Sequence, residues 1–308
     1  MTITVLAGGT GSIKLVRGLA AIEKEIAVIC NVGDNIWIHG LYVCPDIDTI
    51  IYGLANMLDK KRGWGIKGDS FQCLAQLKKI GDPAWFGLGD RDLAIHLLRT
   101  SMMKKGKSLS EITDFFRACY SLSAQIIPAT DKEVMTSIVT STRGEMHLQE
   151  FWVKHKGRPK VTGVRYVNAS TAKANTAALD AIERCRAIVI APANPISSIG
   201  PIIALADLRK VLTQNRDKVI AISPLIGRKA VSGPAVKYLR ALGLEASSFG
   251  VANYYADFIS KFIISKEDHR MKLQIEALGV QVYEAKITLK TKSDEVSLSR
   301  RLLRLVEK

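Results

Sequence analysis

Carboxylates gather in the first third of the chain, near a glycine-rich turn. Asp34 follows an apolar run, Asp46 and Asp48 stand two residues apart, and Asp90 and Asp92 repeat that spacing. Any one of them could merely cap a helix. Carboxylates also hold Mg²⁺ beside substrate phosphates and act as general bases. Because three such groups recur at the boundaries of expected elements, we expect at least one to bind metal or to act in catalysis.

The glycine-rich turn is Gly8-Gly9-Thr10-Gly11, between apolar residues 3–7 and a helical pattern over residues 12–19. Glycines let the backbone approach a phosphate, and a helix N-terminus offers free N–H groups. Lys14 adds a cation one helical turn later. A dinucleotide fingerprint would need glycine at position 14, and the Walker sequence is absent. The turn therefore predicts a phosphate site of another kind, and it disfavours a nicotinamide-dependent oxidoreductase.

Alternating strands and helices must position these residues. The pattern predicts a single α/β domain over residues 1–308 with a three-layer, doubly wound, mostly parallel (Rossmann-like) sheet. A mostly helical insertion is expected at about 60–125, and a β-hairpin at 135–141 and 146–153. The expected sheet strands are 3–7, 25–31, 187–191, 219–222 and 280–284. The expected helices are 12–19, 49–59, 70–79, 90–103, 108–120, 201–214, 233–242, 256–263 and 268–278.

Polar residues follow several of the expected strands. Asn31 ends the second strand, Asn194 and Ser197 follow residues 187–191, and Ser223 follows residues 219–222. In doubly wound sheets, ligands bind beyond the carboxyl ends of the strands where the strand order reverses. These side chains could therefore meet a base or sugar, although ordinary turns use the same residue types.

Composition limits the remaining classes. The chain has 308 residues, 47% hydrophobic content and a formal charge of +15. No apolar run approaches the ~20 residues of a membrane span, and no signal-peptide pattern is present. Five scattered cysteines without a C-x-x-C pair suit reduced thiols, so we expect a cytoplasmic protein. The basic run at 154–160 comes without a nucleic-acid-binding motif, so we expect neither nucleic acid nor membrane as a partner. The positive charge can instead attract a polyanionic small substrate.

The ordered motifs carry a resemblance to a known family. They are Gly8-Gly9-Thr10-Gly11 with Lys14, Asn31-Val32-Gly33-Asp34, His39-Gly40-Leu41, Cys44-Pro45-Asp46-Ile47-Asp48-Thr49, Leu88-Gly89-Asp90-Arg91-Asp92-Leu93-Ala94, Asn194-Pro195 with Ser198-Ile199, and Gly233-Pro234-Ala235. From residue 3 to about 265 the chain resembles the 2-phospho-L-lactate transferase (CofD) family of coenzyme F-420 biosynthesis.

The resemblance implies an enzyme. A lactyl or enolpyruvyl diphosphoguanosine would donate its phospholactyl or phosphoenolpyruvyl group to the ribityl hydroxyl of the deazaflavin Fo, which releases GMP and forms F-420-0. It implies Mg²⁺ on Asp46 and Asp48, catalysis by Asp48 with Asp92 as second choice, and a homodimer. Metal ligand and base compete for the same carboxylates, and the sequence does not separate the two roles. The expected substrate-binding residues are Gly8, Gly9, Thr10, Gly11, Lys14, Asn31, Asp34, Asp48, Trp85, Gly87, Leu88, Asp90, Arg91, Asn194, Ser197 and Ser223.

Three positions depart from the family pattern, which commonly has aspartate at Asn35, serine at Ala193 and often a basic residue at Gly87. A related family of regulatory nucleotide-sugar-binding proteins, the gluconeogenesis-factor type, shares a similar opening turn and is the alternative. The segments 39–41 and 44–49 fit the transferase pattern instead.

Overall fold

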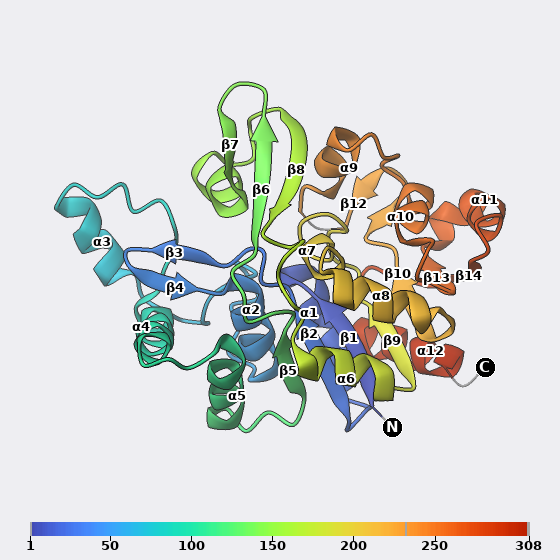
Figure 1. Ribbon diagram of the computed structural model, residues 1–308, viewed down its shortest axis with the longest axis horizontal. Helices are drawn as coiled ribbons and strands as arrows, with labels where there is room; N and C mark the ends of the chain where they lie inside the picture. The colour runs from blue at the N-terminus through green and yellow to red at the C-terminus, as the bar shows by residue number, and fades with distance from the viewer. Residues whose placement is uncertain (1, 232, 307–308) are drawn as a thin grey trace.

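A seven-stranded parallel sheet forms the centre of the protein (Figure 1). The computed structural model describes residues 2–231 and 233–306. The strand order is β14-β13-β10-β9-β1-β2-β5, and every neighbouring pair is parallel. Its strands are β1 Ile3–Ala7, β2 Ile26–Cys30, β5 Gln125–Pro128, β9 Ala187–Ile190, β10 Val219–Ile222, β13 Lys261–Ile264 and β14 Gln281–Glu284.

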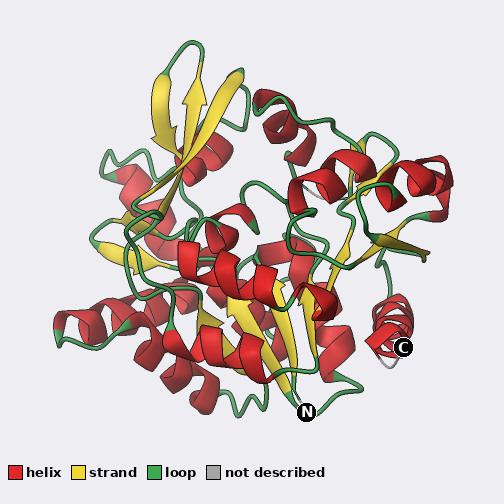
Figure 2. Cartoon of the chain, turned by 45° about the vertical axis from the view of Figure 1, so that its right-hand side comes forward, coloured by secondary structure: helices red, strands yellow, loops and turns green. Residues whose placement is uncertain are grey.

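Helices cover both faces of this sheet, as Figure 2 shows, which confirms the three-layer α/β fold. The inner strands β9 and β10 are apolar throughout, and β1 is apolar except for Thr4, because both of their faces are buried. On one side, α1 (Gly9–Ala20) packs against α2 (Pro45–Leu54) and α12 (Lys292–Val306). On the other, α6 (Thr176–Arg184) packs against α8 (Ala206–Gln214), which follows the short α7 (Gly200–Ile203). Near the β14 end of the sheet lie α10 (Ser248–Tyr255), η3 (Lys266–Met271) and α11 (Lys272–Glu276), which contact one another, and α9 (Ala235–Ala241) lies above them in Figure 1.

The strand order reverses between β1 and β9. From β1 the chain moves outward to β2 and β5, and from β9 it moves the other way to β10, β13 and β14. The loops that follow β1 and β9 therefore separate and leave a crevice at the carboxyl ends of the strands. Residues 8–11 follow β1 and residues 191–199 follow β9, so both sequence-predicted polar loops lie at this switch point.

Smaller units surround the crevice. The insertion holds α3 (Gln72–Lys79), α4 (Asp90–Lys104) and α5 (Leu109–Cys119), and α5 begins with a capping box of Ser108 and Glu111. A hairpin of β3 (Ile36–Ile38) and β4 (Leu41–Val43) precedes α2. A three-stranded sheet, in the order β7-β6-β8, projects above the main sheet in Figure 1. Its strands are β6 Met135–Thr140, β7 Gly144–His147 and β8 Val161–Val167.

Several predicted boundaries were wrong. The helix expected at 49–59 begins at Pro45, because proline suits a first helical position, so Asp46 and Asp48 lie inside α2. The hairpin strand expected to reach residue 153 ends at His147, and the π-helix η1 (Glu150–Lys154) follows. The helix expected at 201–214 is split into α7 and α8. The helix expected at 256–263 is instead the loop after α10 and most of β13. The sequence pattern also missed β3, β4, β5, β8, α10 and α12.

The remaining short elements complete the chain. They are η2 (Arg216–Lys218), β11 (Leu225–Ile226) and β12 (Lys229–Ala230). Within residues 2–231 and 233–306, each helix is too short or too polar to cross a bilayer.

Close packing of α1 against α12 makes a glycine necessary at position 18. A Cβ on Gly18 would collide with the carbonyl group of Glu295, whose side chain is paired with Arg17. We expect Gly18→Ala to lower the free energy of unfolding by about 1–3 kcal/mol, because a backbone neighbour has little room to move away. Gly163→Ala is the matched control, since its Cβ would meet Val139 at an ordinary 3.7 Å. Urea unfolding measures both variants, and equal stability losses would contradict the packing argument.

Candidate active site

The glycine turn opens into a pocket of about 400 Å³ at the switch point, which we call the glycine-turn pocket. Helix α1 begins at Gly9 and has no side-chain cap, so its first N–H groups are free for a ligand. Asn194 and Ser197 from the loop after β9 form the opposite wall. Both amide and backbone donors thus face one cavity, which is the arrangement that an anionic group needs.

Asp46 lies against the turn itself. A Cβ on Gly9 would collide with the Asp46 carboxylate, and one on Gly8 would lie 3.0 Å from its Oδ2 atom. Gly9 also has a φ of +47°, which favours glycine. The first two glycines therefore permit the close approach of α2 to the turn.

One amide group links Asp46 to a second carboxylate. Nδ2 of Asn31 donates to Oδ2 of Asp46 at 2.8 Å, to Oδ1 of Asp34 at 3.1 Å and to the carbonyl of Ser197 at 3.2 Å. Burial raises the pKa of Asp46 to about 7, although the Asn31 hydrogen bond opposes the shift. Burial and the negative charge of Asp46 raise the pKa of Asp34 well above its ordinary value. Two buried carboxylates without a positive neighbour form an environment that a cation would stabilise.

Asp34 and Asp46 therefore suit Mg²⁺ better than Asp46 and Asp48 do. Among the described residues, no three His, Cys, Asp or Glu side chains are placed to share a metal ion. Two carboxylates suffice for Mg²⁺, which usually keeps waters and takes substrate phosphate oxygens as its other ligands. Asp48 is already neutralised by Arg99. The pairing of Asp46 with Asp48 stays a prediction, and Asp46 with Asp34 is the pair whose charges no cation already compensates.

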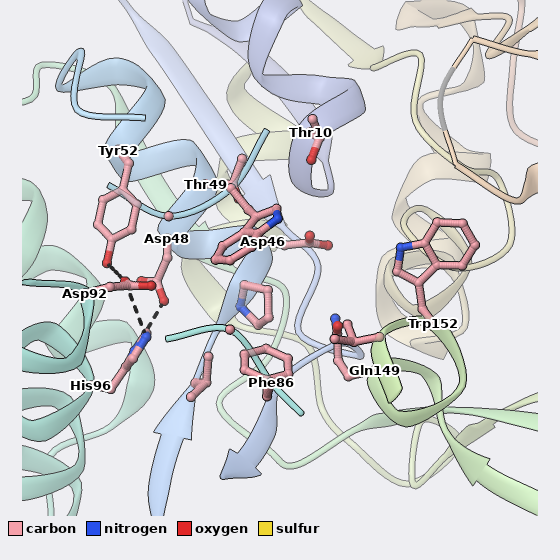
Figure 3. Close-up of a pocket in the computed structure, with 16 residues that line it drawn as sticks. Thr10, Asp46, Asp48, Thr49, Tyr52, Phe86, Asp92, His96, Gln149 and Trp152 are labelled. Atoms are coloured by element: carbon pink, nitrogen blue, oxygen red, sulfur yellow. Dashed lines mark hydrogen bonds and ion pairs between the residues drawn. The ribbon is translucent and has the colours of Figure 1, made fainter. Parts of the chain in front are cut away.

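A second pocket of about 260 Å³ lies on the far side of Asp46, and we call it the His96 pocket (Figure 3). Asp48 on its floor pairs with Arg99, which is only 1% exposed. Asp92 accepts a hydrogen bond from the Tyr52 hydroxyl at 2.6 Å and lies 3.3 Å from Nε2 of His96. Figure 3 shows Asp48, Asp92, His96 and Tyr52 pointing toward one another.

The hydrogen bonds assign the tautomer of His96. Nη1 of Arg99 lies 2.9 Å from Nδ1 of His96, and a guanidinium can only donate, so Nδ1 accepts. The ring proton of neutral His96 is then on Nε2, toward Asp92. Burial raises the pKa of Asp92, but His96 and Tyr52 outweigh it and the pKa is lowered overall.

One oxygen of Asp48 has no hydrogen-bond partner. Its Oδ1 is bound by Arg99, whereas Oδ2 is buried, makes no hydrogen bond, and lies 3.8 Å from Nδ1 of His96 in the wall of the His96 pocket. Burial raises the pKa of Asp48, and Arg99 and His96 oppose that shift. A buried acceptor without a donor is costly unless a ligand supplies one. The free oxygen is therefore placed to accept a hydroxyl proton from a molecule in this pocket.

The two pockets share a wall. Thr10, Asp46, Trp64, Gln149 and Trp152 line both of them. In Figure 3, Trp152 lies across the pocket from Tyr52 and His96, while Asp46 lies between them. The tryptophans are 41% and 45% exposed, so large aromatic surfaces face solvent at the mouths of the pockets. A group transferred between two ligands bound in these pockets would pass beside Asp46.

Most sequence-predicted site residues come together here. Gly8, Gly9, Thr10, Gly11, Asp34, Asn194 and Ser197 line the glycine-turn pocket, and Asp48, Gly87 and Asp92 line the His96 pocket. Asp46 lines both, and Asn31 lies fully buried beside it.

Six predicted site residues lie elsewhere. Lys14 is exposed, and its Nζ donates to the carbonyl of Leu289 at 2.9 Å, because position 14 of α1 faces the segment before α12. Asp90 caps α3, since its carboxylate accepts from the N–H groups of Gln72 and Cys73.

The other four residues also contact their neighbours in the chain or fold and line neither pocket. Trp85 and Leu88 pack in a small apolar cluster with Phe86, which takes the place in the His96 pocket that we expected for Trp85. Arg91 has only a long contact, 3.4 Å, from Nη1 to the carbonyl of Lys67. Ser223 is buried and accepts from the N–H group of Leu225 within its own turn.

Sequence reasoning missed several residues of the site. Arg99, His96 and Tyr52 stand in helices whose patterns suggested only packing, and the contacts of Tyr52 with Asp92 and of Arg99 with Asp48 join residues 40 or more positions apart in the chain. Trp64 had a detectable signal, because a tryptophan between two glycines, Gly63 and Gly65, marks an exposed turn.

The buried pair of Asp48 and Arg99 should be strongly coupled. We expect Arg99→Met to lower the free energy of unfolding by about 3–5 kcal/mol, because it leaves the Asp48 carboxylate buried without its cation. Adding Asp48→Asn to Arg99→Met should recover part of that loss. A double-mutant cycle by urea unfolding measures the coupling. Strictly additive losses would show that the two side chains contribute independently.

The protein is similar to known proteins in fold and in sequence. A crystal structure of a UPF0052 family protein from Bacillus halodurans has a TM-score of 0.66 and covers 98% of each chain, at 15% identity. This likeness concerns the fold alone. The family model of 2-phospho-L-lactate transferase CofD matches residues 3–302.

Curated relatives agree with the family model along the chain. The 2-phospho-L-lactate transferase of Methanosarcina mazei is 39% identical over 293 residues, which cover 94% of this chain and 95% of that protein. That of Methanopyrus kandleri is 38% identical over 308 residues, which cover 100% and 98%. The chain therefore belongs to the 2-phospho-L-lactate transferase CofD family, as its motifs predicted, and it is a transferase.

Proposed function

We propose that the protein transfers a 2-phospholactyl or phosphoenolpyruvyl group from a diphosphoguanosine donor to the ribityl hydroxyl of the deazaflavin Fo. The products are GMP and F-420-0. The observation that carries the proposal is the pair of pockets that meet at Asp46 beside the glycine turn. Two substrates bound on either side of one carboxylate can react without either having to move far.

The donor belongs in the glycine-turn pocket. Its diphosphate would lie against the free N–H groups at the start of α1, and the guanosine would extend toward Asn194 and Ser197. Nδ2 of Asn194 supports this placement because it is buried and has no hydrogen-bond partner, while Oδ1 of the same side chain accepts from Ile196 and Ser197.

The acceptor belongs in the His96 pocket. Apolar groups of Val43, Phe86 and Trp152 give this pocket walls that suit a planar ring, and Gly87 leaves room for the indole of Trp64. The polar floor of Asp48 and Asp92 gives the ribityl chain carboxylate acceptors. A planar apolar ring joined to a polyol matches this division of the pocket.

The reaction forms one bond and breaks one. The ribityl oxygen attacks the phosphorus that carries the lactyl or enolpyruvyl group, the bond from that phosphorus to the GMP oxygen breaks, and the hydroxyl loses its proton. Oδ2 of Asp48, which makes no hydrogen bond, would accept that proton, while Arg99 holds the carboxylate in place. Mg²⁺ bound to Asp34 and Asp46 would neutralise charge on the phosphates.

A direct assay tests this function. The purified protein with Fo, lactyl-2-diphospho-5'-guanosine and Mg²⁺ should release GMP and form a phosphodiester with the mass of F-420-0. The enolpyruvyl donor, assayed in parallel, decides which group this chain transfers. EDTA should abolish turnover, because the phosphates would then face Asp34 and Asp46 without a cation. Failure to form product with either donor would refute the proposal, and full turnover in metal-free buffer would remove Mg²⁺ from it.

Asn194 provides a test of the donor pocket. We expect Asn194→Asp to weaken GDP binding by about 1–3 kcal/mol, because it keeps the Oδ1 acceptor for the turn but replaces the free N–H donor with negative charge. Lys14→Ala should leave GDP affinity unchanged, since Lys14 lies outside the pocket. Isothermal titration calorimetry measures both. Weaker binding in Lys14→Ala, with Asn194→Asp unaffected, would place the nucleotide elsewhere.

A further inference from the structure

Positive charge is scarce around the two pockets although the chain carries a formal charge of +15. Among the described residues that line them, Arg62 is the one Lys or Arg, and it lines the glycine-turn pocket. Asp34 and Asp46 make the same pocket acidic. A diphosphate entering it therefore needs a cation beyond the N–H groups of the turn, and Lys14 lies elsewhere.

Arg62 is held in a defined position. Nη2 donates to the carbonyl of Ile66 at 2.8 Å and lies 3.1 Å from Oδ2 of Asp59. The guanidinium also stacks over Trp64 and Phe71, 5.3 Å and 4.8 Å from the ring centroids. These contacts restrain the side chain before any ligand arrives, so less conformational entropy is lost when it binds an anion.

One polar atom of Arg62 remains without a partner. Nε is buried and makes no hydrogen bond, although a guanidinium N–H normally finds an acceptor. Asp59 and Ile66 occupy Nη2 on the other side of the group. The unpaired donor is a second, independent sign that an anionic or polar ligand completes the contacts of this residue.

The loop that carries Arg62 is attached to the glycine turn. Oγ1 of Thr10 donates to the carbonyl of Gly63 at 3.1 Å, and the N–H group of Gly63 donates to the carbonyl of Asp59 at 2.8 Å. A bridge between Leu58 and Ile66 closes the base of the loop. The turn that would receive the phosphates and the loop that carries the arginine are therefore fixed to each other.

We propose that Arg62 is the cation that binds the diphosphate of the nucleotide donor in the glycine-turn pocket. This inference rests on the proposed function and adds a specificity: the guanidinium distinguishes a nucleoside diphosphate from a monophosphate. Its charge offsets the negative field of Asp34 and Asp46, which would otherwise repel the donor. The guanidinium can approach phosphate oxygens without losing the contacts of Nη2 with Asp59 and Ile66.

Calorimetric titration of the full-length protein with GDP and with GMP, in Mg²⁺, tests the inference. We expect Arg62→Gln to raise the Kd for GDP roughly tenfold or more and to change that for GMP less, so that the preference for the diphosphate shrinks. Arg91→Gln is the matched control, because this arginine lies outside both pockets. Its affinities should equal those of the wild type.

Asp59→Asn separates binding from loop structure. It weakens the anchor of Arg62 but keeps the guanidinium charge. Equal losses of GDP affinity in Asp59→Asn and Arg62→Gln would mean that Arg62 acts only by holding the loop, and this outcome overturns the inference, as does an unchanged Kd in Arg62→Gln. If Arg62→Gln does not fold, Arg62→Lys replaces it: several-fold weaker GDP binding supports the inference, and an unchanged Kd overturns it.

The same titrations keep the two proposals apart. Wild-type protein that fails to bind GDP contradicts the proposed function and the inference with it. Wild-type protein that binds GDP, together with Arg62→Gln that binds it equally well, leaves the proposed function intact and removes Arg62 alone.

Discussion

The amide group of Asn31 holds together the three segments on which the candidate site depends. It bonds Asp34 in the loop after β2, Asp46 in the first turn of α2 and the carbonyl of Ser197 after β9. Asn31 itself directly follows β2, and its Oδ1 accepts from the N–H group of Gly33, so its orientation is fixed. Both carboxylates consequently face the pocket at the glycine turn. Asp46 can lie this close to the turn because Gly8 and Gly9 have no side chains.

Charge is balanced differently on the two sides of Asp46. In the His96 pocket, Arg99 compensates Asp48, and Tyr52 and His96 contact Asp92, so the charges on this side are balanced although Oδ2 of Asp48 makes no hydrogen bond. In the glycine-turn pocket, Asp34 and Asp46 share a neutral amide, and burial raises the pKa of both carboxyl groups. In the reaction that we propose, Asp48 is a preorganised base on one side of Asp46, and metal and substrate bind at the carboxylates on the other side.

Local sequence patterns predicted the sheet and the glycine turn because a buried parallel strand needs an unbroken apolar run, and a phosphate turn needs glycine. The same patterns could not separate carboxylates that cap helices from those that reach a pocket. Asp90 and Asp46 both lie near the start of a helix. Asp90, however, accepts hydrogen bonds from the first N–H groups of α3, which lie 17 and 18 positions earlier in the chain. Lys14 likewise has the right spacing from the turn. However, α1 packs against α12, which the sequence pattern did not reveal, and Lys14 therefore contacts the segment before α12 instead of the pocket.

The two pockets of the candidate site are built from different parts of the fold. The glycine-turn pocket uses loops at the switch point of the sheet, which any doubly wound fold possesses, and a protein of 15% identity from Bacillus halodurans shares that fold across 98% of its length. The His96 pocket is lined instead by α2, by residues near η1, and by α4 and the residues before it, which belong to the helical insertion. In the reaction that we propose, the donor phosphates therefore bind at the switch point of the sheet, and the insertion shapes part of the pocket for the acceptor. Changes in the insertion can alter the shape of the His96 pocket while Asn31 still holds Asp34 and Asp46 beside the turn.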